Sequence, residues 1–455
     1  MLEKNDWSDQ EKFVWKKLVA GEKADFNTEP GYGGPLDPKT PGDWAGKENR
    51  VLRPRFLKTI LLDEGHRKTL AHKKVAISGA WFTEELDLSD ATLANFLALD
   101  FCRFEKDVDF FHLQTPNLIS LNKSTFSGEL IMDSLRVEDS LLMRDGAQFN
   151  EVILRGAKIG RQLNMGNSTF SGELNMEKLQ VGDDLFMHHV ESEFLETVNL
   201  VMAKIGGSLV LAGSQNLPSF NLTGARIDGE FRLAQGAKHA TWQDDAKLTL
   251  RNARVRAIQD HPDAWPNHLV REGFTYDWLG GFSADGENDM ADRNVDWYLE
   301  WLGDKQKSHS PQPYEQLANV LEKHGRKDTA DDIRYEKKEQ ERLNTNRRTL
   351  RYFWLLLQKT FIGYGYRYEH TLLWVLGLIT VGVILLYVPH CAPPGFYEKL
   401  IFCLDKFLPL VKFRTASNPS INLTGWVQIY FDFLQVMGYV LVSYLIAGLS
   451  GLTKK

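Results

Sequence analysis

The heptapeptide STFSGEL occurs twice, at residues 124–130 and 168–174, and the two copies lie 44 residues apart. They belong to an eleven-residue repeat in which each unit begins with an aliphatic anchor residue. The anchors are Leu86, Leu97, Val108, Ile119, Leu130, Leu141, Val152, Leu163, Leu174 and Leu185. A second apolar residue follows two positions after each anchor, so both side chains lie on one face of an extended strand. The repeat therefore predicts one short strand per unit, with its apolar face inward.

The length of the repeated block predicts how these strands are wound. Because the identical heptapeptides are four units apart, we expect two units, or about 22 residues, in each coil of a parallel β-helix, which buries its apolar side by stacking coil on coil. The phase of the repeat shifts after Leu185 and again before Leu248, which predicts insertions of two and six residues as loops at a corner. Cys102 lies where small residues recur, so we expect a buried, inert thiol.

Composition and periodicity divide the chain into five segments. The predicted fold class is mainly β: a parallel β-helix with an α-helical N-terminal cap, a helical connector and two C-terminal transmembrane helices. Apolar residues at helical spacing in segments 9–20 and 53–62 predict the helices of the cap. The five segments are the cap at 1–75, the β-solenoid at 76–258, an irregular linker at 259–312, a helical hairpin and juxtamembrane helix at 313–369, and a transmembrane, pore-like domain at 370–455.

The sequence carries few of the patterns that enzymes and metalloproteins require. Its 455 residues have a formal net charge of -6, and its three cysteines, Cys102, Cys391 and Cys403, show no CxxC spacing. The Gly- and Pro-rich loop that begins at Gly31 contains neither a GxGxxG nor a GxxxxGKS pattern. We therefore predict no catalytic residues, no metal site, no cofactor and no enzymatic activity. The first residues lack the apolar core of a signal peptide, so we expect a cytoplasmic N-terminus.

Several cations follow the last recognisable repeats. They are Arg251, Arg254, Arg256, His261, His268 and Arg271. An anionic ligand could bind there, but solvated charge on an exposed face explains the same pattern, since the aromatic residues typical of nucleic-acid grooves do not alternate with these cations.

The C-terminal part has the pattern of a membrane protein. Residues 342–367 contain six basic and no acidic residues together with aromatic ones, which is typical of a helix on the anionic inner face of a membrane. Residues 371–388 are 18 uncharged residues, and a second apolar stretch begins at Trp426. The basic segment and the final Lys454 and Lys455 predict that the N-terminal domain and the C-terminus are cytoplasmic.

The second apolar stretch contains a polar stripe. Its residues recur at steps of three or four and so share one helical face. They are Gln428, Asp432, Gln435, Tyr439 and Ser443. Because a charged side chain deep in a bilayer costs about 2.5 to 3.5 kcal/mol on insertion scales, we expect this face to line the path of a pore. Two spans per chain cannot enclose a water path, so the stripe also predicts a ring of identical subunits.

The segment between the two predicted spans refines this prediction. Residues 396–404 have helical spacing, and the order span, short helix, span resembles a potassium-channel pore unit, for which we expect a homotetramer. No TVGYG-like filter follows, so we expect weak ion selectivity. Cys391 and Cys403 both lie in this outer segment, where a disulfide between them is one alternative.

Several motifs resemble those of known bacterial families. They are RPRFLKTILL, ISGAWFTEELDLSDATL, PYEQLANVLEKHGRKDTADDIR, FIGYGYR and LDKFLPLV. In this order they resemble β-helix proteins with pentapeptide-like repeats and two C-terminal spans that are often labelled membrane-associated oxidoreductases. The architecture also resembles Hailong-type channel-like effectors of antiphage defence. That resemblance implies a place in the bacterial inner membrane, membrane depolarisation, a nucleotide or oligonucleotide signal, and a partner enzyme that makes the signal.

Two functions of different classes fit these patterns. The first is a homo-oligomeric channel-like effector in the membrane, gated by a ligand of the β-helix. The alternative is a membrane-anchored β-helix scaffold without pore activity. An enzyme is a third possibility, which bound cofactor in the absorbance spectrum of the purified protein would indicate and which we do not expect.

Overall fold

The protein is described here by a computed structural model, which covers residues 6–189, 191–192, 197–281, 290–303, 310–387, 395–408, 423 and 425–449 in describable detail. The chain divides into two compact units, Met1–Asn294 and Val295–Lys455. Each unit is considered by itself.

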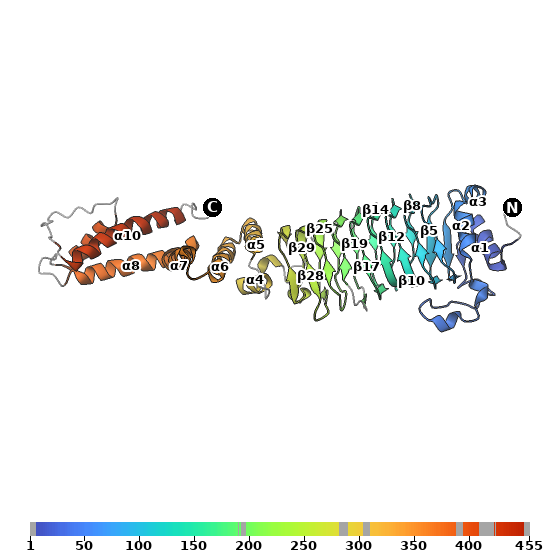
Figure 1. The fold of residues 1–455 in the computed structure, drawn as a ribbon, viewed down its shortest axis with the longest axis horizontal. Coiled ribbons are helices and arrows are strands. Elements are labelled where there is room, and N and C mark those ends of the chain that lie inside the picture. The colour runs from blue at the N-terminus through green and yellow to red at the C-terminus, as the bar shows by residue number, and fades with distance from the viewer. Residues whose placement is uncertain are drawn as a thin grey trace. The chain divides into compact units, whose positions relative to one another are not determined.

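Parallel strands stacked coil upon coil form the body of the first unit. Leu97 pairs with Ile119, Ile119 with Leu141 and Leu141 with Leu163, so equivalent residues of successive coils are 22 positions apart. Two sheets result, named sheet A and sheet B, and the described coils make about nine turns (Figure 1). The predicted β-helix with two repeat units per coil is confirmed.

Most strands contain only two residues, because each straight segment of a coil holds little more than one apolar anchor and its neighbour. Sheet A consists of β1 (Ala24–Asp25), β2 (Val75–Ser78), β5 (Leu97–Asp100), β8 (Gln114–Thr115), β9 (Ile119–Ser120), β11 (Arg136–Val137), β12 (Leu141–Leu142), β14 (Lys158–Ile159), β15 (Leu163–Asn164), β18 (Gln180–Val181), β19 (Leu185–Phe186), β22 (Lys204–Ile205), β23 (Leu209–Val210), β25 (Arg226–Arg232), β29 (Arg254–Gln259) and β31 (Thr275–Leu279). Sheet B consists of β3 (Trp81–Phe82), β4 (Leu86–Asp87), β6 (Arg103–Phe104), β7 (Val108–Asp109), β10 (Thr125–Ile131), β13 (Gln148–Ile153), β16 (Thr169–Phe170), β17 (Leu174–Asn175), β20 (Glu191–Ser192), β21 (Val198–Asn199), β24 (Phe220–Asn221), β28 (Lys247–Thr249) and β30 (His268–Val270).

Side chains of one type stack along the axis inside the solenoid. Phe82, Phe104, Phe126, Phe149 and Phe170 form such a column, with neighbouring ring centroids 4.4 to 5.2 Å apart and ring planes within 22° of parallel. All five are at most 3% exposed. Parallel strands are about 4.8 Å apart, which allows offset stacking of rings in successive coils, so each of the three inner rings lies between the rings of the coils before and after it.

A left-handed backbone residue turns the chain four positions after each anchor. Its φ lies between +51° and +65° at Asp90, Phe101, His112, Lys123, Ser134, Asp145, Gly156, Asn167, Lys178 and His189. Only one of these ten is glycine, although the conformation is rare for other residues. The strands on both sides therefore determine this corner more than the type of residue at it.

The longer of the two predicted insertions is visible at a corner. Phe220 pairs with Leu248, so this coil is six residues longer than the usual 22. The extra length contains the hairpin of β26 (Ala234–Gln235) and β27 (Lys238–His239). Leu185 pairs with Leu209, so two residues are inserted before Leu209. The segment between β20 and β21 in which they fall includes residues 193–196, which lie outside the described residues.

The solenoid continues past residue 258, where the sequence pattern predicts an irregular linker. β30 pairs in parallel with β28, and β31 pairs in parallel with β29. The spacing in these pairs, as between Lys247 and His268, is shorter by one position than in the regular coils. In addition, Pro262 and Pro266 interrupt the apolar alternation. These changes in period hid the last strands from a search for the eleven-residue repeat.

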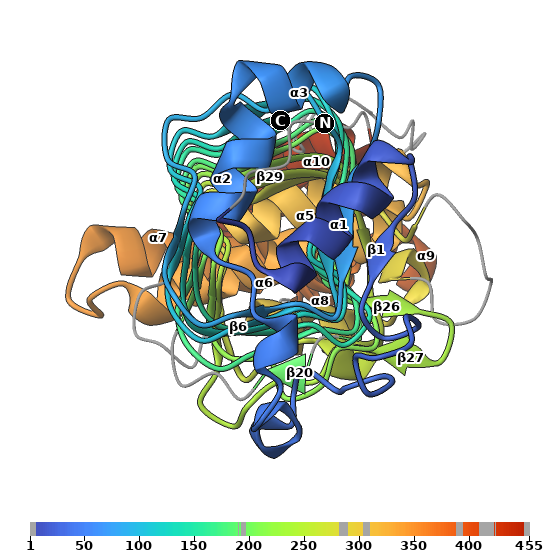
Figure 2. The ribbon, with the colours of Figure 1, turned by 90° about the vertical axis from the view of Figure 1, so that its right-hand side faces the viewer.

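Helices close the first coil. α1 (Asp9–Val19), α2 (Pro54–Leu62) and α3 (Glu64–Thr69) lie across the end of the solenoid (Figure 2). α1 and α2 correspond to the helices expected at residues 9–20 and 53–62, whereas α3 was not expected. Four apolar residues of α2 are buried, so α2 covers apolar surface that the first coil would otherwise leave exposed.

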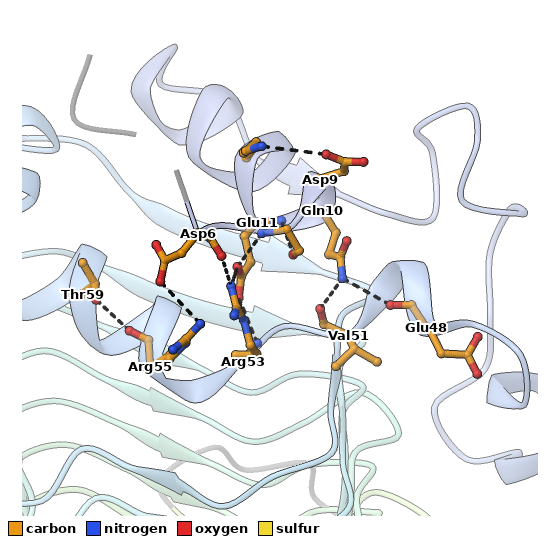
Figure 3. Close-up of polar contacts among 11 residues, drawn as sticks. Asp6, Asp9, Gln10, Glu11, Glu48, Val51, Arg53, Arg55 and Thr59 are labelled. Carbon is orange, nitrogen blue, oxygen red and sulfur yellow. Dashed lines mark hydrogen bonds and ion pairs between the residues drawn. The ribbon is translucent and has the colours of Figure 1, made fainter. Parts of the chain in front are cut away.

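A buried carboxylate joins α1 to the start of α2. Glu11 accepts hydrogen bonds from the backbone N–H of Ser8 at 2.9 Å and from Nε of Arg53 at 2.8 Å (Figure 3). Burial raises the pKa of Glu11, but these hydrogen bonds outweigh it and hold the pKa below its usual value. Nearby, the side-chain amide of Gln10 donates to the carbonyl oxygen of Val51 at 3.0 Å. The cap is thus attached by charge-assisted hydrogen bonds as well as by apolar packing.

The second unit is helical. It contains α4 (Val295–Leu302), α5 (Gln312–Lys323), α6 (Lys327–Asn344), α7 (Leu350–Ile362), η5 (Gly363–Gly365), α8 (Tyr368–Leu385), α9 (Phe396–Phe407) and α10 (Trp426–Leu449). Gly325, with a φ of +80°, turns the chain between α5 and α6, which form the expected hairpin. α9 is the expected short helix between the two apolar stretches.

The sequence predicts two separate membrane spans in this unit, at residues 371–388 and from Trp426 onward. Within the described residues, no helix taken singly has both the length and the apolar composition to cross a membrane. One pair of helices has both when its parts are taken together, namely 350–365 with 369–385, but the pair is bent by 109°. The helices are therefore present, and the two spans stay a prediction.

Candidate functional site

The six predicted ligand-binding cations lie on several faces of the last coils. Arg254 and Arg256 belong to β29 of sheet A, whereas His268 belongs to β30 of sheet B. Nη2 of Arg251 lies 3.1 Å from Oε2 of Glu272.

The remaining two of these cations are enclosed by neighbouring groups. Arg271 is buried, and the His261 ring stacks on the ring of His239 with centroids 4.6 Å apart. The structure does not bring the six together in one cluster, and their ligand-binding role stays a prediction.

A groove of about 910 Å³ runs along sheet A of the solenoid instead. Its wall is formed by the outward-facing first residues of β11, β14, β18, β22 and β25, which follow one another along one edge of the solenoid, where Figure 1 labels β14 and β25. These residues are Arg136, Lys158, Gln180, Lys204 and Arg226. They occupy equivalent positions in five successive coils, so the structure aligns four cations and one amide in a row, here called the basic ladder.

Glycines form the neighbouring strip of the groove. Gly160, Gly182 and Gly206 occupy equivalent positions two residues after Lys158, Gln180 and Lys204. A Cβ atom at any of the three would overlap the backbone carbonyl oxygen of the coil before it. Glycine therefore lets the coils approach here, and it leaves a depression bounded by the basic ladder.

Charge along the groove is uneven. Within the described part of the chain, Arg136, Lys158 and Lys204 have no ion-pair partner, whereas Nε of Arg226 donates to Oδ1 of Asp228 at 2.7 Å. The carboxylates that line the groove are Asp228 and Glu138, two residues from the ladder's last and first cations. Between Lys158 and Lys204, the residues that line the groove beside the ladder are the three glycines together with Ile159, Val181 and Ile205.

Arg254, one of the predicted cations, continues the ladder beyond the groove. It pairs in register with Arg226, and its Nη2 lies 3.6 Å from Oδ2 of Asp277. The other cations of the ladder were missed because the search followed apolar anchors. The signal that could have found them is the polar residue six positions after alternate anchors, which recurs once in each coil.

The predicted pore stripe lies on one face of α10. Gln428, Asp432, Gln435, Tyr439 and Ser443 are all exposed in the single chain. A different face of α10 is buried against α8 and α9, in a core made by Ile379, Val383, Leu386, Cys403, Phe407, Phe431, Leu434 and Leu441. The five residues thus share an exposed face of α10, and their pore-lining role stays a prediction.

Close packing holds α9 against α10. A Cβ atom at Gly438 would overlap the backbone carbonyl oxygen of Phe407, at the end of α9. Cys403 is buried in the same core, and Cys391, its suggested disulfide partner, lies outside the described residues.

A carboxylate in α6 links α6 to α7 and η5. Glu339 accepts hydrogen bonds from Nζ of Lys359 at 2.8 Å and from the hydroxyl of Tyr364 at 2.9 Å, and its Oε1 pairs with Arg342 at 2.5 Å. The hydrogen bond from Arg342 is the main cause that lowers the pKa of Glu339 to about 2. The connector therefore reaches the apolar helices through a fixed ionic contact.

Metal and thiol chemistry find little support in the described residues. No group of three or more His, Cys, Asp or Glu side chains there could hold a metal ion. Cys102 is fully buried, and burial raises the pKa of its thiol to about 12, which keeps it protonated and inert.

No family model, curated protein or solved structure that was compared with the chain matches it.

Proposed function

We propose that the chain is the subunit of a homo-oligomeric, channel-like membrane effector that is gated by a ligand of its solenoid. In this proposal α8 and α10 cross the bacterial inner membrane, the solenoid and the C-terminus are cytoplasmic, and the assembly is a homotetramer. By the resemblance described above, the effector acts in antiphage defence by depolarising the membrane. A nucleotide or oligonucleotide signal from a partner enzyme controls it.

The observation that carries the proposal is the polar stripe of α10. It is exposed, while Phe431, Leu434 and Leu441 of the same helix pack against α8 and α9. A helix in lipid would place Asp432 at a cost of about 2.5 to 3.5 kcal/mol if it lay deep in the bilayer, so this face requires water or other subunits. A ring of copies with α10 inward supplies both.

The solenoid and the connector would supply the gating. A ligand shifts a channel only if it binds the open and closed states with different affinity. The contact of Glu339 with Lys359 and Tyr364 offers one route by which α6 could pass such a difference to α7 and α8.

Dye release from liposomes that contain the purified full-length chain tests the channel. We expect flux from the wild type and a loss of most of it in Asp432→Leu with Gln435→Leu, because the two changes remove polar groups from the stripe. Val436→Leu with Val440→Leu, on exposed apolar positions of the same helix, is the matched control and should conduct.

The scaffold alternative predicts different results from the same material. A monomer in mild detergent, together with no flux with or without nucleotide ligands, would contradict the channel and favour a membrane-anchored scaffold.

A further inference from the structure

We infer that the groove beside the basic ladder binds a linear chain of phosphate groups. The inference rests on the proposed sensing role of the solenoid, and it names the site and the chemistry of the ligand. It differs from the site predicted at the last coils, of which only Arg254 lies in line with the ladder.

The spacing of the ladder suits a ligand whose charge repeats along its length. Parallel strands are about 4.8 Å apart, so the four steps from Arg136 to Arg226 extend over about 19 Å. A single phosphate would meet one or two of these cations. A chain of phosphates lying along the solenoid axis would meet them all at once.

The unpaired charges of the ladder favour an anion strongly. Arg136, Lys158 and Lys204 are exposed and lack an ion-pair partner among the described residues, so an anion would not have to displace a carboxylate from them. Like charges in successive coils also repel one another, and a bound polyanion would relieve that repulsion. Elsewhere on the solenoid, Arg155 and Arg103 are already paired with Asp133 and Glu105.

The groove offers shape as well as charge. Gly160, Gly182 and Gly206 expose backbone beside the ladder, so a phosphate chain can lie in the depression while the longer Lys and Arg side chains reach over it. None of the described residues that line the groove is aromatic. Bases would find no stacking surface, so a nucleic acid would be held by its backbone without regard to sequence.

Two sources share this chemistry, namely a single-stranded oligonucleotide and inorganic polyphosphate. Binding of fluorescein-labelled oligothymidylate to the full-length chain in detergent, competed by unlabelled polyphosphate, distinguishes them. Competition at comparable concentrations assigns the site to phosphate chains of either source. Binding of the oligonucleotide without competition assigns it to nucleic acid, and binding of labelled polyphosphate alone assigns it to polyphosphate.

Three unpaired cations predict a definite salt dependence. With about 0.7 counterions released per contact to a single strand, the dissociation constant should rise roughly twentyfold between about 50 and about 200 mM salt. In Lys158→Gln with Lys204→Gln, affinity should fall on the order of tenfold at the lower salt, and the rise should shrink to about threefold.

Gln180→Lys provides a gain of function at the same site. It completes the ladder between Lys158 and Lys204, so it should tighten binding about threefold or more and steepen the salt dependence by about one further contact. A variant that only damaged the fold could not produce this result.

Lys106→Gln with Lys247→Gln is the matched control, because it removes two exposed lysines from the sheet B side of the solenoid. The inference is overturned if this control loses as much affinity as the ladder variant, if Gln180→Lys does not tighten binding, or if polyglutamate competes as well as polyphosphate. These measurements report binding alone, so they stand whether or not the liposomes conduct.

Discussion

The two units of the chain differ in how many large apolar side chains they expose. Among the described residues of the first unit, large apolar side chains are exposed at Leu62, Phe111, Met202 and Trp278. In the second unit they recur along α7, α8 and α10, and Leu350 is 90% exposed. The solenoid completes its own core, because each coil is covered by its neighbours and the first by a helical cap. The helical unit leaves apolar faces exposed in the single chain, and the proposed channel would cover them with lipid or further copies of the chain.

Charging the exposed face of α8 should produce the largest effect. Leu373→Glu with Leu376→Glu introduces two carboxylates where lipid is proposed, at a cost of about 5 to 7 kcal/mol if both lie deep in the bilayer. We expect the variant to lose co-sedimentation with vesicles. Leu62→Glu with Met202→Glu, at exposed apolar positions of the first unit, is the control and should sediment like the wild type. Unchanged association of the α8 variant would remove the contrast between the units.

Opening the aromatic column tests the self-sufficient core of the solenoid. Phe126→Ala leaves a cavity between the rings of Phe104 and Phe149 and should lower the free energy of unfolding by about 3 to 5 kcal/mol. Urea unfolding followed by the β signal in circular dichroism measures it. Phe111→Ala, at an exposed corner, should change the midpoint little. Equal shifts in the two variants would mean that the column contributes nothing special.

Adding a methyl group to the glycine strip is expected to have a smaller effect. Gly182→Ala places Cβ against the carbonyl oxygen of Gly160, so adjacent coils must move apart, at a cost of about 1 to 3 kcal/mol. Gly42→Ala, where no atom lies within 4 Å of the added Cβ, should be neutral or slightly stabilising. The same urea series gives both values, and a neutral Gly182→Ala would show that the coils have slack at the groove.

Acidification should weaken the connector gradually. The pKa of Glu339 is lowered to about 2 from an ordinary 4.5, so its contribution to stability is complete above about pH 4.5 and is lost as the pH falls towards 2. Helical signal of the full chain in detergent, melted at several pH values across this range, should show the decline. Glu339→Gln should flatten part of it, whereas Glu336→Gln on the same helix should not. An identical pH profile for wild type and Glu339→Gln would contradict the assignment.

The sequence predicted the structure best in the solenoid, where every coil must bury an apolar side chain at the same position. Anchors such as Leu97, Ile119 and Leu141 must all point inward, and their common spacing gave the strands, the coil length and the corners that accept insertions. The last strands were not predicted because their spacing is shorter by one position, as between Arg254 and Thr275. The parallel pairing of β29 with β31 is nevertheless kept. Pairing in three dimensions tolerates a change of period that a search along the chain does not.

The two candidate sites, the polar stripe of α10 and the basic ladder, differ in how far the sequence alone could predict them. The spacing of Gln428 and Asp432 gave their common face, because a helix converts spacing into direction without help from other elements. The basic ladder depends on the stacking of separate coils, so Lys158 and Lys204 become neighbours of the same groove only through the sheet. A search for apolar anchors does not detect the polar positions of a solenoid. Their recurrence can be recognised only once the number of residues per coil is known.

The hairpin β26–β27 has a practical consequence. Phe220 and Leu248 keep their parallel register across it although six extra residues intervene, and Gly236 at its turn has no neighbour within 4 Å of the position of a Cβ atom. That corner therefore accepts foreign sequence without disturbing the strands on either side. A fluorescent protein or an affinity tag inserted at Gly236 would report on the assembled protein in living cells while leaving both termini and the basic ladder untouched.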